Sequence, residues 1–170
     1  MQTLTLLLLA SLLALSTAEG RNYPVIPNDA DCPNFRCLTF DDYVEQSRSY
    51  FRKGTTFQFF NGNHTLQREL ELHGVSNITL KGASGQENTD IVCDLTSGIT
   101  LLNAFNITLK GLTFLLHNYE RDIDSALTLR SSSLLISNMI FRGNGNLNMY
   151  YLARAVYLKT ASEIAITDSQ

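Results

Sequence analysis

The sequence predicts an all-β chain that winds as a right-handed parallel β-helix, a solenoid of about four coils behind an N-terminal capping helix. The first supporting observation is a hexapeptide, NITLKG, which occupies residues 77–82 and returns unchanged 29 residues later at 106–111. The second is the alternation of apolar and polar residues within each copy, with Ile78 and Leu80 on one side of Thr79. Alternation of this kind is typical of strands that bury one face.

Weaker copies of the hexapeptide continue the repeat. One occupies residues 134–141 and another begins at residue 163, at spacings of 27 and 30 residues. Further short strands are expected between the copies, at residues 91–93, 99–101, 127–129 and 156–158. A period near 29 residues fits three short strands and three turns, so each repeat is expected to form one coil stacked in parallel on the last.

This arrangement makes a specific register prediction. Ile78 is expected to contact Ile107, and Leu80 to contact Leu109, in parallel neighbouring strands. An antiparallel β-sandwich is the alternative, and identical hexapeptides one period apart favour the solenoid over it. The unequal spacing is attributed to loops of changing length at one corner of the coil, residues 83–90, 115–125 and 142–151.

The segment before the repeats predicts a helix over the first coil. Thr39 and Asp42 have the spacing of a capping box, with Asp in place of the usual Glu. The residues that follow place a mostly apolar stripe at helical spacing. The members of this stripe are Phe40, Tyr43, Val44, Ser47, Tyr50 and Phe51. Residues 57–66 and 70–72 are then expected to build the first coil.

The N-terminus predicts export. Residues 4–15 are almost entirely apolar, and the small residues Ser16 and Ala18 precede Glu19. We therefore interpret residues 1–18 as a signal peptide, 19–55 as the segment with the capping helix, and 56–170 as β-helix repeats. A membrane anchor is the alternative, but the apolar run is shorter than the roughly 20 residues that span a bilayer. The expected location is secreted or at the extracellular surface.

An exported chain can carry disulfides and glycans. The closest cysteines, Cys32 and Cys37, are the expected disulfide, which leaves Cys93 as a buried small side chain on a strand. Sequons begin at Asn63, Asn77 and Asn106, which are therefore expected glycosylation sites. Because Asn77 and Asn106 lie one period apart, they could instead form a hydrogen-bonded ladder between adjacent coils.

The order of motifs resembles a known family. CLTFDDY at residues 37–43 is followed by FFNGNHTL at 59–66, NITLKG at 77–82 and GLTF at 111–114. This order resembles the secreted right-handed β-helix proteins with a pectin-lyase-like fold that occur in sponges and other simple animals. The resemblance implies the fold and carries no activity. Stacks of that family usually run past four coils, so the chain is expected to be an N-terminal fragment with truncated repeats.

No catalytic, metal or cofactor constellation is visible in the sequence. The acidic candidates are Asp90, Asp94, Asp122 and Asp124, and the basic candidates are Arg130, Arg142 and Arg154. None of them belongs to a motif of the pectin hydrolases or lyases, and the three histidines have no acidic partner at a fixed spacing. No cofactor is therefore expected.

The leading prediction is a non-enzymatic extracellular binding, adhesion or recognition module. Its ligand surface is predicted in the variable loops, where aromatic and polar side chains gather; the residues are Tyr119, Asp122, Asp124, Tyr150 and Tyr151. The alternative is that these loop tyrosines pack against their own coil. The expected partner is an extracellular protein or glycan. The mild net charge of -3 argues against nucleic acid, and no later segment is apolar enough to span a membrane. A carbohydrate-active enzyme of the pectin-lyase-like type is the alternative.

Overall fold

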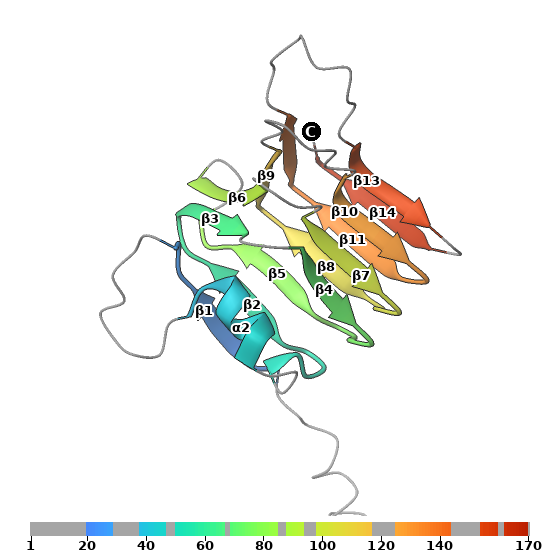
Figure 1. Cartoon of the computed structure of the whole chain (residues 1–170), viewed down its shortest axis with the longest axis horizontal. Helices are drawn as coiled ribbons and strands as arrows, with labels where there is room; N and C mark the ends of the chain where they lie inside the picture. Colours follow the sequence, from blue (N-terminus) through green and yellow to red (C-terminus); the bar gives the residue numbers. More distant parts are fainter. Residues whose placement is uncertain are drawn as a thin grey trace, which may run out of the picture.

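The computed structural model describes residues 20–28, 38–46, 50–66, 69–84, 88–93, 98–116, 125–143, 154–159 and 162–169. These residues form an all-β structure of parallel sheets with one described helix, α2 (Phe40–Gln46) (Figure 1). The strands are β1 (Asn22–Val25), β2 (Thr56–Phe59), β3 (Gly62–Leu66), β4 (Leu70–His73), β5 (Thr79–Gly82), β6 (Thr89–Cys93), β7 (Ile99–Leu102), β8 (Ile107–Lys110), β9 (Thr113–Leu116), β10 (Ser125–Arg130), β11 (Ser133–Ser137), β12 (Ile140–Gly143), β13 (Arg154–Lys159) and β14 (Glu163–Thr167). The short strands predicted between the hexapeptide copies are confirmed as β6, β7, β10 and β13.

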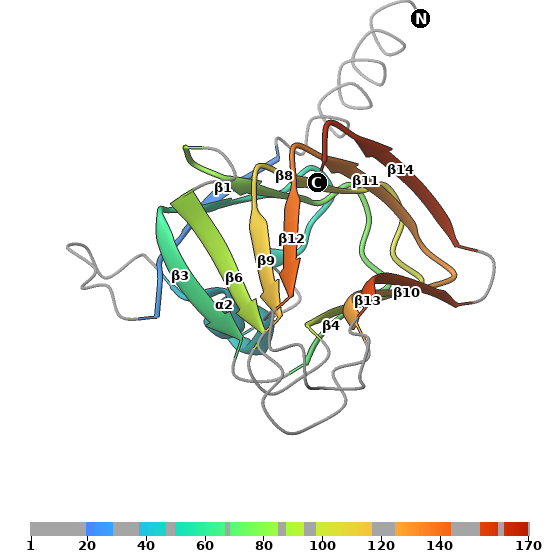
Figure 2. The same cartoon turned by 90° about the horizontal axis from the view of Figure 1, so that it is seen from above.

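The strands form three sheets that the chain visits in rotation. Sheet A has the order β1-β2-β5-β8-β11-β14, sheet B the order β12-β9-β6-β3, and sheet C the order β13-β10-β7-β4. From β2 to β11, each strand pairs in parallel with the strand three positions further along the chain. Figure 2 shows the three sheets arranged around a shared interior.

The predicted register between the identical hexapeptides is confirmed. Leu80 is the partner of Leu109 and Thr79 is the partner of Thr108 in the parallel pair β5–β8. The amide of Thr108 also donates a hydrogen bond to the carbonyl oxygen of Ile78, at 2.8 Å. The antiparallel alternative is therefore wrong for these strands.

The inward positions form the apolar core between the sheets. They lie in columns that follow the strand pairing, such as Phe57–Leu80–Leu109–Ile136 in sheet A and Leu72–Leu101–Leu129 in sheet C. These side chains are at most 2% exposed. The same columns reach β13 and β14 at Leu158 and Ile166, which are 46% and 57% exposed. Burial is therefore deepest in the middle of the stack.

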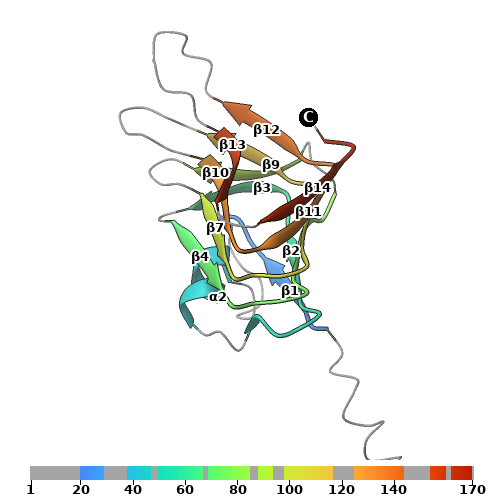
Figure 3. The ribbon, with the colours of Figure 1, turned by 90° about the vertical axis from the view of Figure 1, so that its right-hand side faces the viewer.

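The predicted helix and its capping box are both present. The Thr39 amide donates to an Asp42 carboxylate oxygen at 3.0 Å, and the Asp42 amide donates to the Thr39 hydroxyl at 3.3 Å. This reciprocal pair satisfies amide groups that the first helical turn leaves without backbone partners. Figures 1 and 3 place α2 at the end of the stack that holds β1 and β2.

Aromatic side chains join α2 to the first strands. Phe40 contacts Phe57 and Phe59 at centroid distances of 5.5 and 5.1 Å, and Tyr43 contacts Phe57 at 5.3 Å. The Tyr43 hydroxyl donates to the Pro24 carbonyl oxygen at 2.9 Å, and burial raises the pKa of Tyr43 to about 12. The predicted helical stripe was too long, because Tyr50 lies beyond the end of α2 at Gln46; it still packs edge-on against Tyr43. Ser47 is outside the described residues.

The corner between sheets A and B needs a residue with a left-handed backbone. Gly111, Asn138 and Asp168 follow β8, β11 and β14 with φ of 63°, 51° and 48°. Gly, Asn and Asp are the residue types that adopt this conformation most readily. At Gly82, which ends β5, a Cβ atom would collide with the carbonyl oxygen of Gly111. The two hexapeptides therefore need glycine for different reasons, close packing at Gly82 and a positive φ at Gly111.

Two expectations about the surface are wrong. The variable loops were placed at one corner, but residues 83–88 connect sheet A to sheet B, whereas 117–124 and 144–153 connect sheet B to sheet C. The alternation of apolar and polar residues predicted strands with one buried face, but the opposite face is not uniformly exposed, because Thr113 and Thr128 point away from the core and are 1% and 6% exposed. Strand periodicity sets the direction of a side chain, whereas its exposure depends on what other segments cover it.

Candidate binding face

Sheet A carries three columns of side chains on its outer face, the face turned away from the core. We call these the asparagine, threonine and lysine columns. The asparagine column contains Asn77, Asn106, Ser133 and Glu163; the threonine column contains Thr56, Thr79, Thr108, Leu135 and Ala165; and the lysine column contains Gln58, Lys81, Lys110, Ser137 and Thr167. Neighbouring strands lie about 4.8 Å apart, so successive members of a column are adjacent.

The asparagine column contains the predicted ladder. Nδ2 of Asn106 donates to Oδ1 of Asn77 at 2.7 Å, and the Asn106 amide donates to the Ser133 hydroxyl at 2.7 Å. Both asparagines have positive φ, 54° and 57°, which fixes the direction of their side chains at the start of β5 and β8. The ladder lies at the surface, because Asn106 is exposed and Asn77 is half-buried.

The threonine column presents hydroxyl groups beside that ladder. Thr56, Thr79 and Thr108 are Cα partners in register, and each is half-buried. A threonine hydroxyl can both donate and accept a hydrogen bond. These β-branched residues also favour the strand conformation.

The lysine column places two like charges side by side. Lys81 and Lys110 are Cα partners in β5 and β8, and both side chains are exposed. Gln58 precedes them on β2, where Oε1 accepts a hydrogen bond of 3.0 Å from Nδ2 of Asn22. No carboxylate lies on the outer face of β1, β2, β5, β8 or β11, so this part of the described surface carries positive charge only.

A groove of about 310 Å³ opens on the same face, over β8, β11 and β14. Asn106, Ser133 and Glu163 supply its polar edge, and Leu135 and Ala165 supply apolar surface. The protruding Leu135 stands next to the much smaller Ala165 in the threonine column, which leaves the depression. A mixed lining of this kind suits a ligand with both hydroxyl groups and apolar faces.

Sheet B brings together a different set of residues. Asn63, Asp90 and Thr113 share an outer column, and Arg142 belongs to the neighbouring one. Burial raises the pKa of Asp90, and the positive charges of Arg142 and His64 act in the opposite direction. His64 itself faces the core, where Nε2 lies 2.8 Å from the Phe60 carbonyl oxygen. Among the predicted acidic and basic candidates, the described residues bring only Asp90 and Arg142 to one face.

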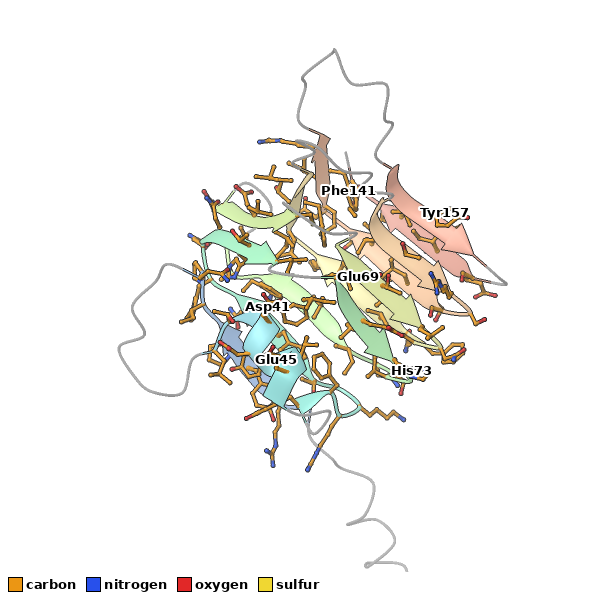
Figure 4. All side chains as sticks on the ribbon, in the orientation of Figure 1. Asp41, Glu45, Glu69, His73, Phe141 and Tyr157 are labelled. Atoms are coloured by element: carbon orange, nitrogen blue, oxygen red, sulfur yellow. The ribbon has the colours of Figure 1, made fainter. Side chains whose placement is uncertain are left out.

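The other predicted site residues are separated or undescribed. Arg130 is exposed at the end of β10 in sheet C, the sheet that also carries Tyr157 and His73 on its outermost strands (Figure 4). The signal peptide, the Cys32–Cys37 pair and the predicted ligand surface lie outside the described residues; that surface comprises Tyr119, Asp122, Asp124, Tyr150 and Tyr151. Cys93 is buried on β6, as expected.

Sequence reasoning missed the lysine column. The signal was present, because both lysines belong to the identical hexapeptides that predicted the register. The apolar positions of the repeat predicted the core and the asparagines predicted the ladder, but the exposed lysine was given no role. Once the hexapeptides pair in parallel, each exposed residue of one copy lies beside the same residue of the other copy.

The described ranges contain neither a metal-ligand cluster nor a membrane-spanning helix. No three His, Cys, Asp or Glu side chains gather there in a way that could hold a metal ion. No helix in those ranges has both the length and the apolar character needed to cross a bilayer.

Comparison with known proteins gives no relative. No family model, curated protein or solved structure matches the chain. Functional inference therefore rests on the residues and their arrangement.

Proposed function

We propose that the chain is an extracellular, non-enzymatic recognition module that binds an extended glycan or a glycosylated protein on the outer face of sheet A. The observation that carries the proposal is the register of β5 and β8, which pairs Asn77 with Asn106, Thr79 with Thr108 and Lys81 with Lys110. Amide, hydroxyl and ammonium groups thus repeat across the sheet. A ligand with its own regular repeat can use such an array at several positions at once.

We further propose that sheet A belongs to a right-handed parallel β-helix. The rotation of the chain through sheets A, B and C supports a parallel β-helix, and crossovers between parallel strands are right-handed in about 98% of cases. A pectin-lyase-like relationship would fit this winding. The face lies on regular strands rather than on loops, so the binding groups need little ordering when a ligand arrives.

The binding proposal is tested by blocking the face. Thr79→Tyr combined with Thr108→Tyr places two bulky, strand-compatible side chains on it, and Glu71→Tyr on the exposed face of sheet C is the matched control. Binding is measured on an array of neutral and acidic polysaccharides and extracellular glycoproteins, with protein produced in a bacterial periplasm so that no glycan covers Asn77 or Asn106. We expect the double variant to lose binding at least about tenfold and the control to retain it. Equal binding by all three proteins would contradict the proposal.

A carbohydrate-active enzyme is the second candidate, and Asp90 is the observation that favours it. Burial raises the pKa of Asp90, and a carboxyl group that holds its proton more tightly is the kind of group that serves as a general acid. A glycosidase needs a second carboxylate across the scissile bond, and the described outer face of sheet B supplies none beside Asp90. Incubation with polysaccharides, followed by measurement of new reducing ends, tests for hydrolytic activity. Hydrolysis that Asp90→Asn abolishes would favour the enzyme.

Processing of the chain is part of the same proposal. Export would remove residues 1–18, oxidise the Cys32–Cys37 pair and attach glycans at Asn63, Asn77 or Asn106. Asn63 is exposed on sheet B, whereas Asn77 and Asn106 stand on the proposed binding face. Peptide mapping of protein secreted from animal cells tests each point. A mature N-terminus at Met1 would overturn the extracellular assignment.

A further inference from the structure

We propose that the ligand is an acidic polysaccharide, whose carboxylate or sulfate groups bind Lys81 and Lys110 where it crosses β5 and β8. This inference rests on the proposed function and specifies the ligand class for the same face. Its basis is the arrangement of the two lysines rather than their number. They are Cα partners in adjacent strands, and both are exposed.

The two ammonium groups lack a counter-charge within the described part of the chain. Neither makes an ion pair there, and no carboxylate shares the outer face of the five strands from β1 to β11 in sheet A. Like charges placed directly opposite each other destabilise a sheet. An anionic group between them removes that repulsion and gains two charge-assisted contacts.

The surroundings of the lysines suit a sugar polymer. Thr79 and Thr108 lie in the adjacent column, two residues before each lysine on the same side of the strand. Their hydroxyl groups can bond to sugar hydroxyl groups while the ammonium groups hold the acidic substituents. Because neighbouring strands lie about 4.8 Å apart, a polymer that crosses β5 and β8 meets one threonine and one lysine on each strand.

The charge distribution sets where the acidic units lie. Glu163 stands at the β14 end of the asparagine column and lines the groove, so an anion is disfavoured there. The acidic units are therefore placed over β5 and β8, and the groove over β8, β11 and β14 is left for neutral parts of the ligand.

Other polyanions fit this face less well. Single-stranded nucleic acid is usually held by aromatic side chains that stack on its bases, and the outer face of β2, β5 and β8 carries none. Anionic membranes attract clusters of about four to eight basic residues, and this face has two. Both remain as outcomes of the test.

The test measures binding to polygalacturonate, dextran sulfate and unmodified dextran. The protein is produced in a bacterial periplasm, so that no glycan is added at Asn77 or Asn106. Lys81→Gln with Lys110→Gln removes the paired charges, and Arg130→Gln with Arg142→Gln removes two exposed charges on sheets C and B. We expect binding to one or both acidic polymers, a loss of about tenfold or more in the first variant, and little change in the second.

The two acidic probes distinguish carboxylate from sulfate as the preferred group. An equal loss in both variants would overturn the inference, because binding would then follow net charge alone. Stronger binding to single-stranded DNA or to phosphatidylserine vesicles than to either acidic polymer would also overturn it. If Thr79→Tyr with Thr108→Tyr abolishes ligand binding while the lysine variant does not, the ligand is neutral. The proposed binding face is then upheld and the acidic ligand is wrong. If neither variant affects binding, the face itself is wrong.

Discussion

The outer faces of sheets A and B come from the same repeat but have different environments. On sheet A, Thr79 and Thr108 are half-buried and stand beside exposed lysines. On sheet B, Thr113 is 1% exposed and Val92 is 5% exposed, although both also point away from the core. The outer face of sheet A is therefore open and polar around Thr79 and Thr108, whereas the outer face of sheet B is shielded around Val92 and Thr113.

This difference has a consequence for function. An open face of amide, hydroxyl and ammonium groups can meet a large ligand without rearrangement, which supports recognition on sheet A. A shielded face changes the chemistry of the groups it holds, and Asp90 is the example, because burial raises its pKa. The two candidate functions therefore belong to two different faces, and variants on each can separate them.

The largest effect is expected from placing a charge on the shielded face. Val92→Asp buries a carboxylate without a designed partner, so the free energy of unfolding should fall by about 3 kcal/mol or more. Thr79→Asp makes the matched change on the open face and should cost less than about 1 kcal/mol. Urea unfolding of both variants measures the difference. Similar losses would show that the two faces do not differ in burial.

The asparagine ladder should give the next largest effect. Asn106→Ala loses the hydrogen bond to Asn77 and places a Cβ-bearing aliphatic residue at φ of 57°, at a cost of about 1 to 2 kcal/mol. Asn106→Gly loses the same bond but tolerates the backbone, so it should be the milder change. Thermal unfolding of unglycosylated protein compares them. An alanine variant as stable as the glycine variant would remove backbone conformation as the cause.

The titration of Asp90 should give a smaller, pH-dependent effect. Because its pKa is raised in the folded protein, the folded state holds the proton more tightly than the unfolded chain does. Stability should therefore fall as pH rises from the ordinary Asp range through the raised pKa, and Asp90→Asn should lack this fall. Urea unfolding of both proteins from about pH 3 to about pH 7 shows the difference. Parallel stability profiles would contradict the burial of Asp90.

The positive charge of Arg142 allows a second test of the Asp90 titration. Arg142 lowers the pKa of Asp90, so Arg142→Gln should raise that pKa further and extend the fall in stability to higher pH. The Asp90→Asn/Arg142→Gln double variant serves as the control. If the single Arg142 variant and wild type titrate alike, the two groups do not interact.

The smallest effect is expected on the open face. Lys110→Ser gives β8 the residue type that β11 has in the same column, and it relieves the repulsion with Lys81. We expect a gain of less than about 0.5 kcal/mol that disappears at high salt. Unfolding at low and high ionic strength measures it. A loss of stability in Lys110→Ser would show that the lysines are structural, which would weaken their role in ligand binding.

Sequence alone determined the features that depend on local geometry and repetition. The identical hexapeptides predicted the pairing of Leu80 with Leu109, because identical strands one period apart stack in register. Thr39 and Asp42 predicted the start of α2, because a capping box is satisfied within four residues. The pairing follows from repetition of the sequence, and the helix start follows from local geometry.

Only the tertiary structure decided the environment of each outward-facing residue. Thr79 and Thr113 have the same local pattern, yet one is half-buried on sheet A and the other is shielded on sheet B. Lys81 and Lys110 became a pair of charges only when β5 met β8. The strand period fixes the direction in which a side chain points, but burial and charge pairing depend on segments that are distant in sequence and close in space, which no local pattern specifies.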